Sequence, residues 1–164
     1  MSTAFACGDH MNKTFDCILL SDLIEIGSCV DMLCLKFSKD NHLYCLHIQS
    51  DWSVRNKENT IVCKKDMYVD RNTGKVFDSY FNTYEMTNSL FAFKLRQFNK
   101  MKMLPLKVIK INLDSNNLCV ELENGYHLCT RSYNNYYGEL WRLFEKGNYD
   151  VMHLVAYNTG LTLE

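Results

Sequence analysis

The sequence of 164 residues contains a single proline, Pro105, and only seven glycines. It therefore lacks the composition that is typical of linkers and disordered chains. It has no run approaching the roughly 18 apolar residues that a membrane span requires. Its first residues lack a basic segment followed by an apolar one, which argues against a secretory signal. With 47% hydrophobic residues and a net charge of −1, the chain is predicted to be cytoplasmic and globular.

The eight cysteines form no Cys-x-x-Cys pair, so their spacing indicates neither a zinc site nor a disulfide framework. Most of them lie inside apolar runs, where a free cysteine behaves as a small hydrophobic residue. We therefore expect reduced thiols, and the sequence nominates no metal and no cofactor.

A strand meander is predicted between Ile109 and Thr130, because apolar and polar residues alternate there with the period of a half-buried strand. A loop at 114–117 sets Leu113 opposite Leu118. A three-residue loop at 123–125 sets Leu122 opposite Tyr126, whereas a two-residue loop would place Leu122 on the wrong face. We expect a type I turn there, with Gly125 left-handed in a bulge.

A second hairpin is predicted around Asp40 and Asn41, since both residue types tolerate positive φ. In its register Leu33, Leu35 and Phe37 face Ile48, Leu46 and Tyr44. The strand is expected to continue through Val54, with Val54 opposite Ile61 and Trp52 opposite Cys63 after a loop at 56–59.

Helical spacing of apolar residues predicts helices over 15–26, from about 87 to a point before Pro105, and over 139–145. The run at 23–26 fits a strand equally well, and residues 151–157 are predicted to form a last strand. Residues 1–12 are expected to be a flexible leader and residues 13–164 a single globular domain. The predicted fold class is α+β: antiparallel hairpins and a meander, sandwich- or half-barrel-like, with two or three helices.

Two clusters contain residue types that are able to bind a metal or to act in nucleophilic catalysis. On the outer face of the meander, Cys119 is expected opposite Cys129 and Glu121 opposite His127. Ligands on a flat sheet face rarely converge into a tetrahedron, so we favour a solvated face over a zinc site. Cys34 is expected opposite His47, but a thiol among apolar residues stays protonated, so we favour a packed pair over a catalytic dyad. We therefore expect a protein that is not an enzyme.

The basic residues are unevenly distributed, since no acidic residue lies between Glu85 and Asp114. Six basic residues fall in that stretch, which leaves 12 of the 18 basic residues against 19 acidic ones elsewhere. Such a strip is able to bind RNA or an acidic partner, although we favour its interpretation as the solvated side of an amphipathic helix. The residues assigned to nucleic-acid binding under this alternative are Lys94, Arg96, Lys100 and Lys102.

An aromatic tract at 133–137, followed by Trp141, is the strongest candidate for an interface, because tyrosine and tryptophan supply large contact areas. A loop that packs its rings over a sheet edge is the structural alternative. The predicted partner-binding residues are Tyr133, Tyr136, Tyr137, Trp141 and Arg142, with Glu121 and Glu123 nearby.

Several segments together resemble a family of small, mostly uncharacterised bacterial proteins, which have a hydrophobic-His-Ile-Gln strand and a late Glu-x-Trp-Arg-Phe helix. The matching segments are 31–37, Leu46-His47-Ile48-Gln49 with Trp52, 61–66, 118–126, Glu139-Leu140-Trp141-Arg142 and 153–155. Ser53 stands where the family has an arginine. The resemblance brings no activity, but similar small cytoplasmic domains occur as immunity proteins beside bacterial toxins.

These observations lead to a functional hypothesis: a non-enzymatic cytoplasmic protein that binds another protein. In its most concrete form it is an immunity protein that neutralises a cognate bacterial toxin by occluding the toxin's active site. An RNA-binding or regulatory module that uses the basic segment is the alternative. No membrane partner is expected.

Overall fold

The computed structural model describes residues 15–57, 59–77, 83–133, 138–148, 150–151 and 153–164. In this part of the chain the strands form one antiparallel sheet of 11 strands, in the order β11-β10-β9-β3-β2-β1-β6-β7-β8-β4-β5. Only 18% of the structure is helical. The fold is therefore mostly β, and the prediction of a balanced α+β fold is wrong.

The elements have the following bounds. The first strands are β1 (Asp22–Cys29), β2 (Met32–Lys39), β3 (His42–Ile48), β4 (Asp51–Asn56) and β5 (Asn59–Cys63), followed by the 3-10 helix η1 (Lys64–Tyr68). The helices α2 (Thr83–Asn88) and α3 (Leu90–Lys100) come next. The remaining elements are β6 (Leu106–Asp114), β7 (Asn117–Leu122), the 3-10 turn η2 (Glu123–Gly125), β8 (Tyr126–Arg131), β9 (Glu139–Glu145), β10 (Leu154–Tyr157) and β11 (Gly160–Leu163).

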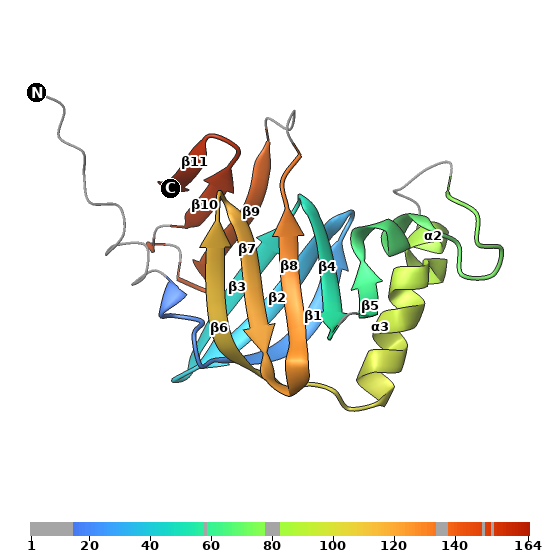
Figure 1. Ribbon diagram of the computed structural model, residues 1–164, viewed down its shortest axis with the longest axis horizontal. Coiled ribbons are helices and arrows are strands. Elements are labelled where there is room, and N and C mark those ends of the chain that lie inside the picture. Colours follow the sequence, from blue (N-terminus) through green and yellow to red (C-terminus); the bar gives the residue numbers. More distant parts are fainter. Residues whose placement is uncertain (1–14, 58, 78–82, 134–137, 149, 152) are drawn as a thin grey trace, which may run out of the picture.

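The sheet folds over into two layers, and Figure 1 shows β6, β7 and β8 crossing in front of β3, β2 and β1. The layers join where β1 pairs with β6, at Asp22 and Leu23. They also join where the chain passes from β3 to β4, because β3 pairs with β2 and β4 pairs with β8. The inner faces share one core, whose largest fully buried side chains include Trp52, Trp141 and Phe37.

Helix α3 lies beside β5 at the open side of the two layers (Figure 1). Ser89 caps its first turn, because its hydroxyl accepts a hydrogen bond from the Ala92 amide at 3.1 Å. Phe91 packs edge-on against Trp52, and Phe98 packs edge-on against Tyr126 of β8. Lys94 forms an ion pair with the buried Asp66 of η1 at 2.9 Å. The helix is thus held by apolar packing together with this ion pair.

The structure confirms the predicted registers of the 40–41 hairpin and of the meander. Leu33, Leu35 and Phe37 pair with Ile48, Leu46 and Tyr44. Leu113 pairs with Leu118, and Leu122 with Tyr126. The predicted type I turn at 123–125 is wrong, because Asn124 has a φ of 61° beside Gly125 at 77°. Asn124 and Gly125 are both left-handed, as are the two central residues of the type I′ turns whose twist matches that of the flanking strands.

Five further local predictions are wrong. A bulge between Val108 and Lys110 leaves Ile109 50% exposed and puts Val108 in the core instead. Val54 pairs with Val62 rather than with Ile61, and Ser53 rather than Trp52 pairs with Cys63.

The other two errors concern helices. The helix expected over 15–26 is absent from residue 22 onward, where β1 begins, and the strand left open for 23–26 is confirmed; residues 139–145 form strand β9 rather than a helix. The expected last strand at 151–157 is present as β10, and β11 follows it.

Among the described residues, no helix is both long enough and apolar enough to cross a membrane.

Candidate functional site

A groove of about 420 Å³ lies on the outer face of β4, β5 and β8. Its position follows from strand alternation, since Trp52 and Val54 point into the core and their neighbours Ser53 and Arg55 point outward. The lining residues come from those three strands and from η1: Asp51, Trp52, Ser53, Arg55, Thr60, Cys63, Lys65, Cys129, Thr130 and Arg131.

The charges of this groove are mostly positive. Arg55, Lys65 and Arg131 are exposed cations from three different elements, whereas Asp51 is the one carboxylate among the described residues of the lining. Asp51 lies directly opposite Arg131 across the β4–β8 pair. The arrangement favours a ligand with negative charge, because three cations around a concave surface attract anions more strongly than one carboxylate repels them.

Tyr133 is placed beside the groove, two residues after Arg131. Its ring is 50% exposed, and its carbonyl accepts a hydrogen bond from the side chain of Asn158 at 2.8 Å. The pKa of Tyr133 is raised, first by partial desolvation and then by the negative charge of Asp51, to which its hydroxyl donates. This predicted anchor therefore lies at the rim of the groove. Tyr136 and Tyr137 lie outside the described residues.

Trp141 is not available to a partner, so its prediction as a surface anchor is wrong. Its side chain is fully buried, and its indole N–H donates to the Asn116 carbonyl at 2.8 Å. Arg142 belongs to the other layer, where it donates to both carboxylate oxygens of Glu139 and to Glu164 at 3.0 Å. Because Trp141 is buried, it does not link Tyr133 and Arg142 into one exposed surface.

The two predicted acidic residues serve local contacts. Glu121 lies 3.8 Å from the Lys110 ammonium and accepts a hydrogen bond from the Asn112 amide. Glu123 accepts a hydrogen bond from the Lys107 backbone N–H at 3.0 Å. Glu121 lies opposite His127, which lies opposite Arg55, so Glu121 shares the outer face of the groove. Glu123 sits in the turn between β7 and β8.

Of the four basic residues of the alternative hypothesis, Lys94 is engaged in an ion pair, whereas Arg96, Lys100 and Lys102 are exposed. Lys94 is held by the buried carboxylate of Asp66, and the Arg96 guanidinium points to the Thr87 carbonyl at 3.4 Å. Lys100 ends α3 and Lys102 lies in the turn that follows, and both are exposed. Because Lys94 is engaged in packing η1 on α3, it is the member least able to contact a nucleic acid.

Cys34 of β2 lies opposite His47 of β3, as predicted, on the outer face of the layer that does not carry the groove. Burial raises the pKa of the Cys34 thiol, and burial lowers the pKa of His47. The thiol therefore stays protonated at neutral pH, and the pair has no nucleophile to offer.

Cys119 and Cys129 lie opposite each other as predicted, but the structure joins them in a disulfide. The expectation that all cysteines are reduced is therefore wrong for this pair. Four other described cysteines carry free thiols, namely Cys29, Cys34, Cys45 and Cys63. No group of three or more metal-ligating side chains is found in the described segments.

The three cations of the groove, Arg55, Lys65 and Arg131, were not predicted from the sequence. A partial signal was present, because alternation along β4 puts Asp51, Ser53 and Arg55 on one face. The pairing of β4 with β8 joins residues about 80 positions apart in the chain, from Asp51 to Arg131, and local sequence carries no signal for it.

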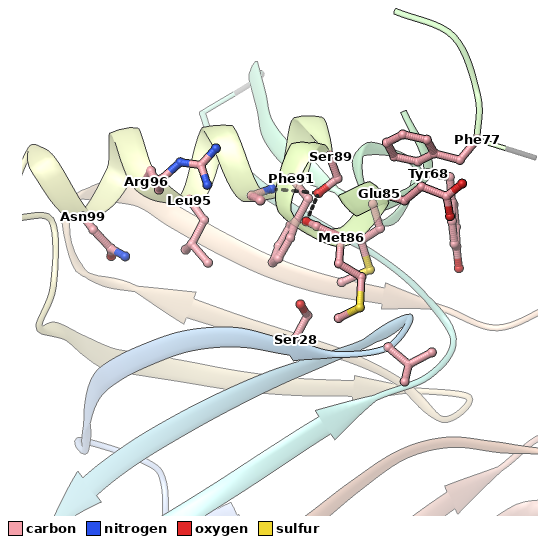
Figure 2. A pocket seen from close by; sticks show the side chains of 13 residues that line it. Ser28, Tyr68, Phe77, Glu85, Met86, Ser89, Phe91, Leu95, Arg96 and Asn99 are labelled. Carbon is pink, nitrogen blue, oxygen red and sulfur yellow. Dashed lines mark hydrogen bonds between the residues drawn. The ribbon is translucent and has the colours of Figure 1, made fainter. Parts of the chain in front are cut away.

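A second concave feature lies under α3. A cleft of about 240 Å³ lies between the helix and the end of β1. Figure 2 shows Phe91 and Leu95 pointing down from the helix, with Ser28 below them. Its lining is largely apolar and includes Met67, Met86 and Phe77.

Comparison of this chain with protein-family models, with curated proteins and with solved structures found no match. The resemblance to small bacterial proteins therefore stays a prediction.

Proposed function

We propose that this protein binds another protein, and that the groove on the outer face of β4, β5 and β8 receives a negatively charged segment of that partner. The observation that carries the proposal is the convergence of Arg55, Lys65 and Arg131 on one concave surface with Tyr133 at its rim. Arginine and tyrosine are the residue types that most often anchor protein interfaces.

The shape of the groove supports a partner segment rather than a small enclosed ligand. Its floor is a sheet face, where Ser53, Thr60 and Cys129 supply a surface without bulky side chains. The cations at its border are exposed, so carboxylates of a partner reach them without burying a charge deeply. Rim charges of this kind raise the association rate more than they tighten the complex.

In its finer form, the proposal is that the protein acts in the bacterial cytoplasm as an immunity protein. It would hold a cognate toxin domain by this face and occlude the toxin's active site. The occlusion is steric and electrostatic, and it requires no chemistry from the chain.

The test is capture from the native host with the tagged protein at near-physiological salt, followed by mass spectrometry. Two charge-reversal variants are compared with the wild type: Arg55→Glu with Arg131→Glu in the groove, and Lys100→Glu on α3 as the matched control. We expect one stoichiometric protein that is lost from the groove variant and kept by Lys100→Glu. Equal recovery on all three proteins would contradict the assignment of the groove.

The RNA-binding alternative is examined with defined probes, namely a labelled polyglutamate peptide and a labelled single-stranded RNA of equal charge. Phosphate contacts make binding fall steeply with salt. Under our proposal the groove variant loses the peptide. RNA binding that is lost in Lys100→Glu, and kept in the groove variant, would favour the alternative.

A further inference from the structure

Strand β1 has a partner on one side along its whole length but on the other side only at its start. It pairs with β2 from Asp22 to Cys29. It pairs with β6 only at Asp22 and Leu23. From Ile26 to Cys29, the second edge of β1 has no strand beside it in the part of the chain that the structure describes. Such an edge presents a row of backbone N–H and C=O groups that another strand can pair with.

The cleft under α3 meets this stretch of β1 at Ser28, which is one of its lining residues. Ser28 and Val30 form one wall, and Phe91, Leu95 and Met86 reach toward them from the helices (Figure 2). At one end the Tyr68 hydroxyl lies 3.4 Å from the Asp31 carboxylate, which joins η1 to the tip of the β1–β2 hairpin. At the other end Asn99 marks the last turn of α3 (Figure 2).

The space beside β1 is open. Ser28 and Cys29 are exposed, although they lie in a strand. The residue that turns the chain after them, Val30, holds a φ of 57°, which a β-branched side chain rarely adopts. Val30 lines the cleft together with Glu85 and Met86 of α2.

We propose that the edge of β1 from Ile26 to Cys29, together with the cleft under α3, binds an extended peptide segment of a partner protein by strand addition. Only an extended chain complements alternating backbone donors and acceptors, and its alternate side chains then fall on one face. Those side chains enter the lining of Phe91, Leu95, Met67 and Met86. Methionine in such a lining adapts to different apolar side chains.

The dimensions set the length of the segment. Four residues of strand edge span about 13 Å at roughly 3.3 Å per residue. The stretch of α3 from Phe91 to Asn99 spans about 12 Å at 1.5 Å per residue. The site therefore fits four to five residues of partner, with two apolar side chains directed into the cleft. Apart from η1, which contributes residues to both, this surface is formed by elements other than those of the groove, so the inference does not rest on the function proposed above.

The test uses a library of random heptapeptides displayed on phage, selected on the full chain, and the best binder is then synthesised. We expect enriched peptides with apolar residues at every second position. The synthetic peptide is also made with alternate backbone amides methylated, which removes hydrogen-bond donors and leaves the side chains unchanged. Strand addition predicts at least a tenfold loss of affinity on methylation. It also predicts slowed hydrogen exchange at Gly27–Cys29 when the unmodified peptide is bound.

Two variants locate the site. Ser28→Phe puts a ring into the cleft from an exposed position and is expected to weaken binding at least tenfold. Gly27→Val is the matched control, because neighbouring strand residues point to opposite faces and its side chain enters open space.

The proposal is overturned by any of three results: no enriched peptide, equal affinity of the methylated peptide, or binding that survives Ser28→Phe. The methylated peptide keeps the proposal testable if Ser28→Phe does not fold. A doubled mass in solution that Ser28→Phe abolishes would assign the edge to a second copy of the chain and would also contradict the proposal.

Discussion

Replacement of Lys94 by methionine separates its structural role from a role in binding nucleic acid. The Lys94 ammonium lies 2.9 Å from Oδ2 of Asp66, whose side chain is only 9% exposed. The same oxygen accepts a hydrogen bond from the Cys63 backbone N–H at 2.9 Å. Removing the ammonium leaves a buried carboxylate with one donor fewer, at the point where η1 meets α3.

The magnitude follows from the burial of the two partners. Breaking a fully buried ion pair costs about 3–5 kcal/mol, whereas exposed pairs contribute roughly 0–1 kcal/mol. Because the Lys94 side chain is 32% exposed, we expect a loss between these limits, about 1–3 kcal/mol. The double variant Asp66→Asn with Lys94→Met removes both charges, and we expect it to recover most of that loss.

The assay is urea unfolding followed by circular dichroism, with Lys100→Met as the control on the same helix. We expect Lys94→Met to lower the unfolding midpoint. For Lys100→Met we expect a free energy of unfolding within about 0.5 kcal/mol of the wild-type value. A Lys94→Met variant as stable as Lys100→Met would refute the reasoning. So would a double variant less stable than Lys94→Met.

Three further predictions concern other parts of the molecule. Trp141→Ala should cost roughly 3–5 kcal/mol in urea unfolding, because the ring is fully buried; a loss below about 1 kcal/mol would mean that Trp141 lies at the surface after all. Burial lowers the pKa of His47, so the unfolded chain binds the proton more tightly and stability should fall as the pH drops through the ordinary histidine pKa. Unfolding midpoints at pH 7.5 and 5.5 check this, and an equal drop in His47→Leu would contradict it. Burial raises the pKa of Cys17 to about 11. At pH 8 its alkylation by iodoacetamide should therefore be about a hundredfold slower than that of a thiol with the ordinary pKa of 9.0. Peptide mapping over time measures the rate, and rapid labelling of Cys17 in the native protein would contradict the prediction because it would show an accessible, ionised thiol.

Hairpins were the part of the fold that the sequence predicted well, because their register depends on neighbours in the chain. Alternation on both sides of Asp40 and Asn41 is enough to place Leu35 opposite Leu46. The bulge at Ile109 was not predictable in this way, since it depends on how β6 meets β1 as well as β7.

Strand β9 shows why the helix content was overestimated. Leu140, Trp141 and Leu143 are all buried, because β9 lies between β3 and β10 in the interior of the sheet. Burial of adjacent residues removes the alternation that marks an edge or surface strand and leaves apolar spacing that also fits a helix. The same ambiguity applied to β1.

Only part of the candidate groove could be predicted from the sequence. Tyr133 was selected from its residue type and its position after a strand, and it lies at the rim. Arg55 and Arg131 come to the same surface only because β4 pairs with β8, and that pairing is set by the packing of two layers. Residue type alone also gave the wrong prediction for Trp141, because tryptophan occurs in protein cores as well as at interfaces.

The central claim is that the face bearing the groove contacts a partner protein. The most direct test is photo-crosslinking in the native host, with a benzophenone amino acid in place of Tyr133 or, as the control, in place of Met101 at the exposed end of α3. We predict a single crosslinked protein from position 133 that is absent at position 101 and absent when Arg55 and Arg131 are both replaced by glutamate. Crosslinks from position 101 alone, or crosslinks from position 133 that survive those replacements, would contradict the claim.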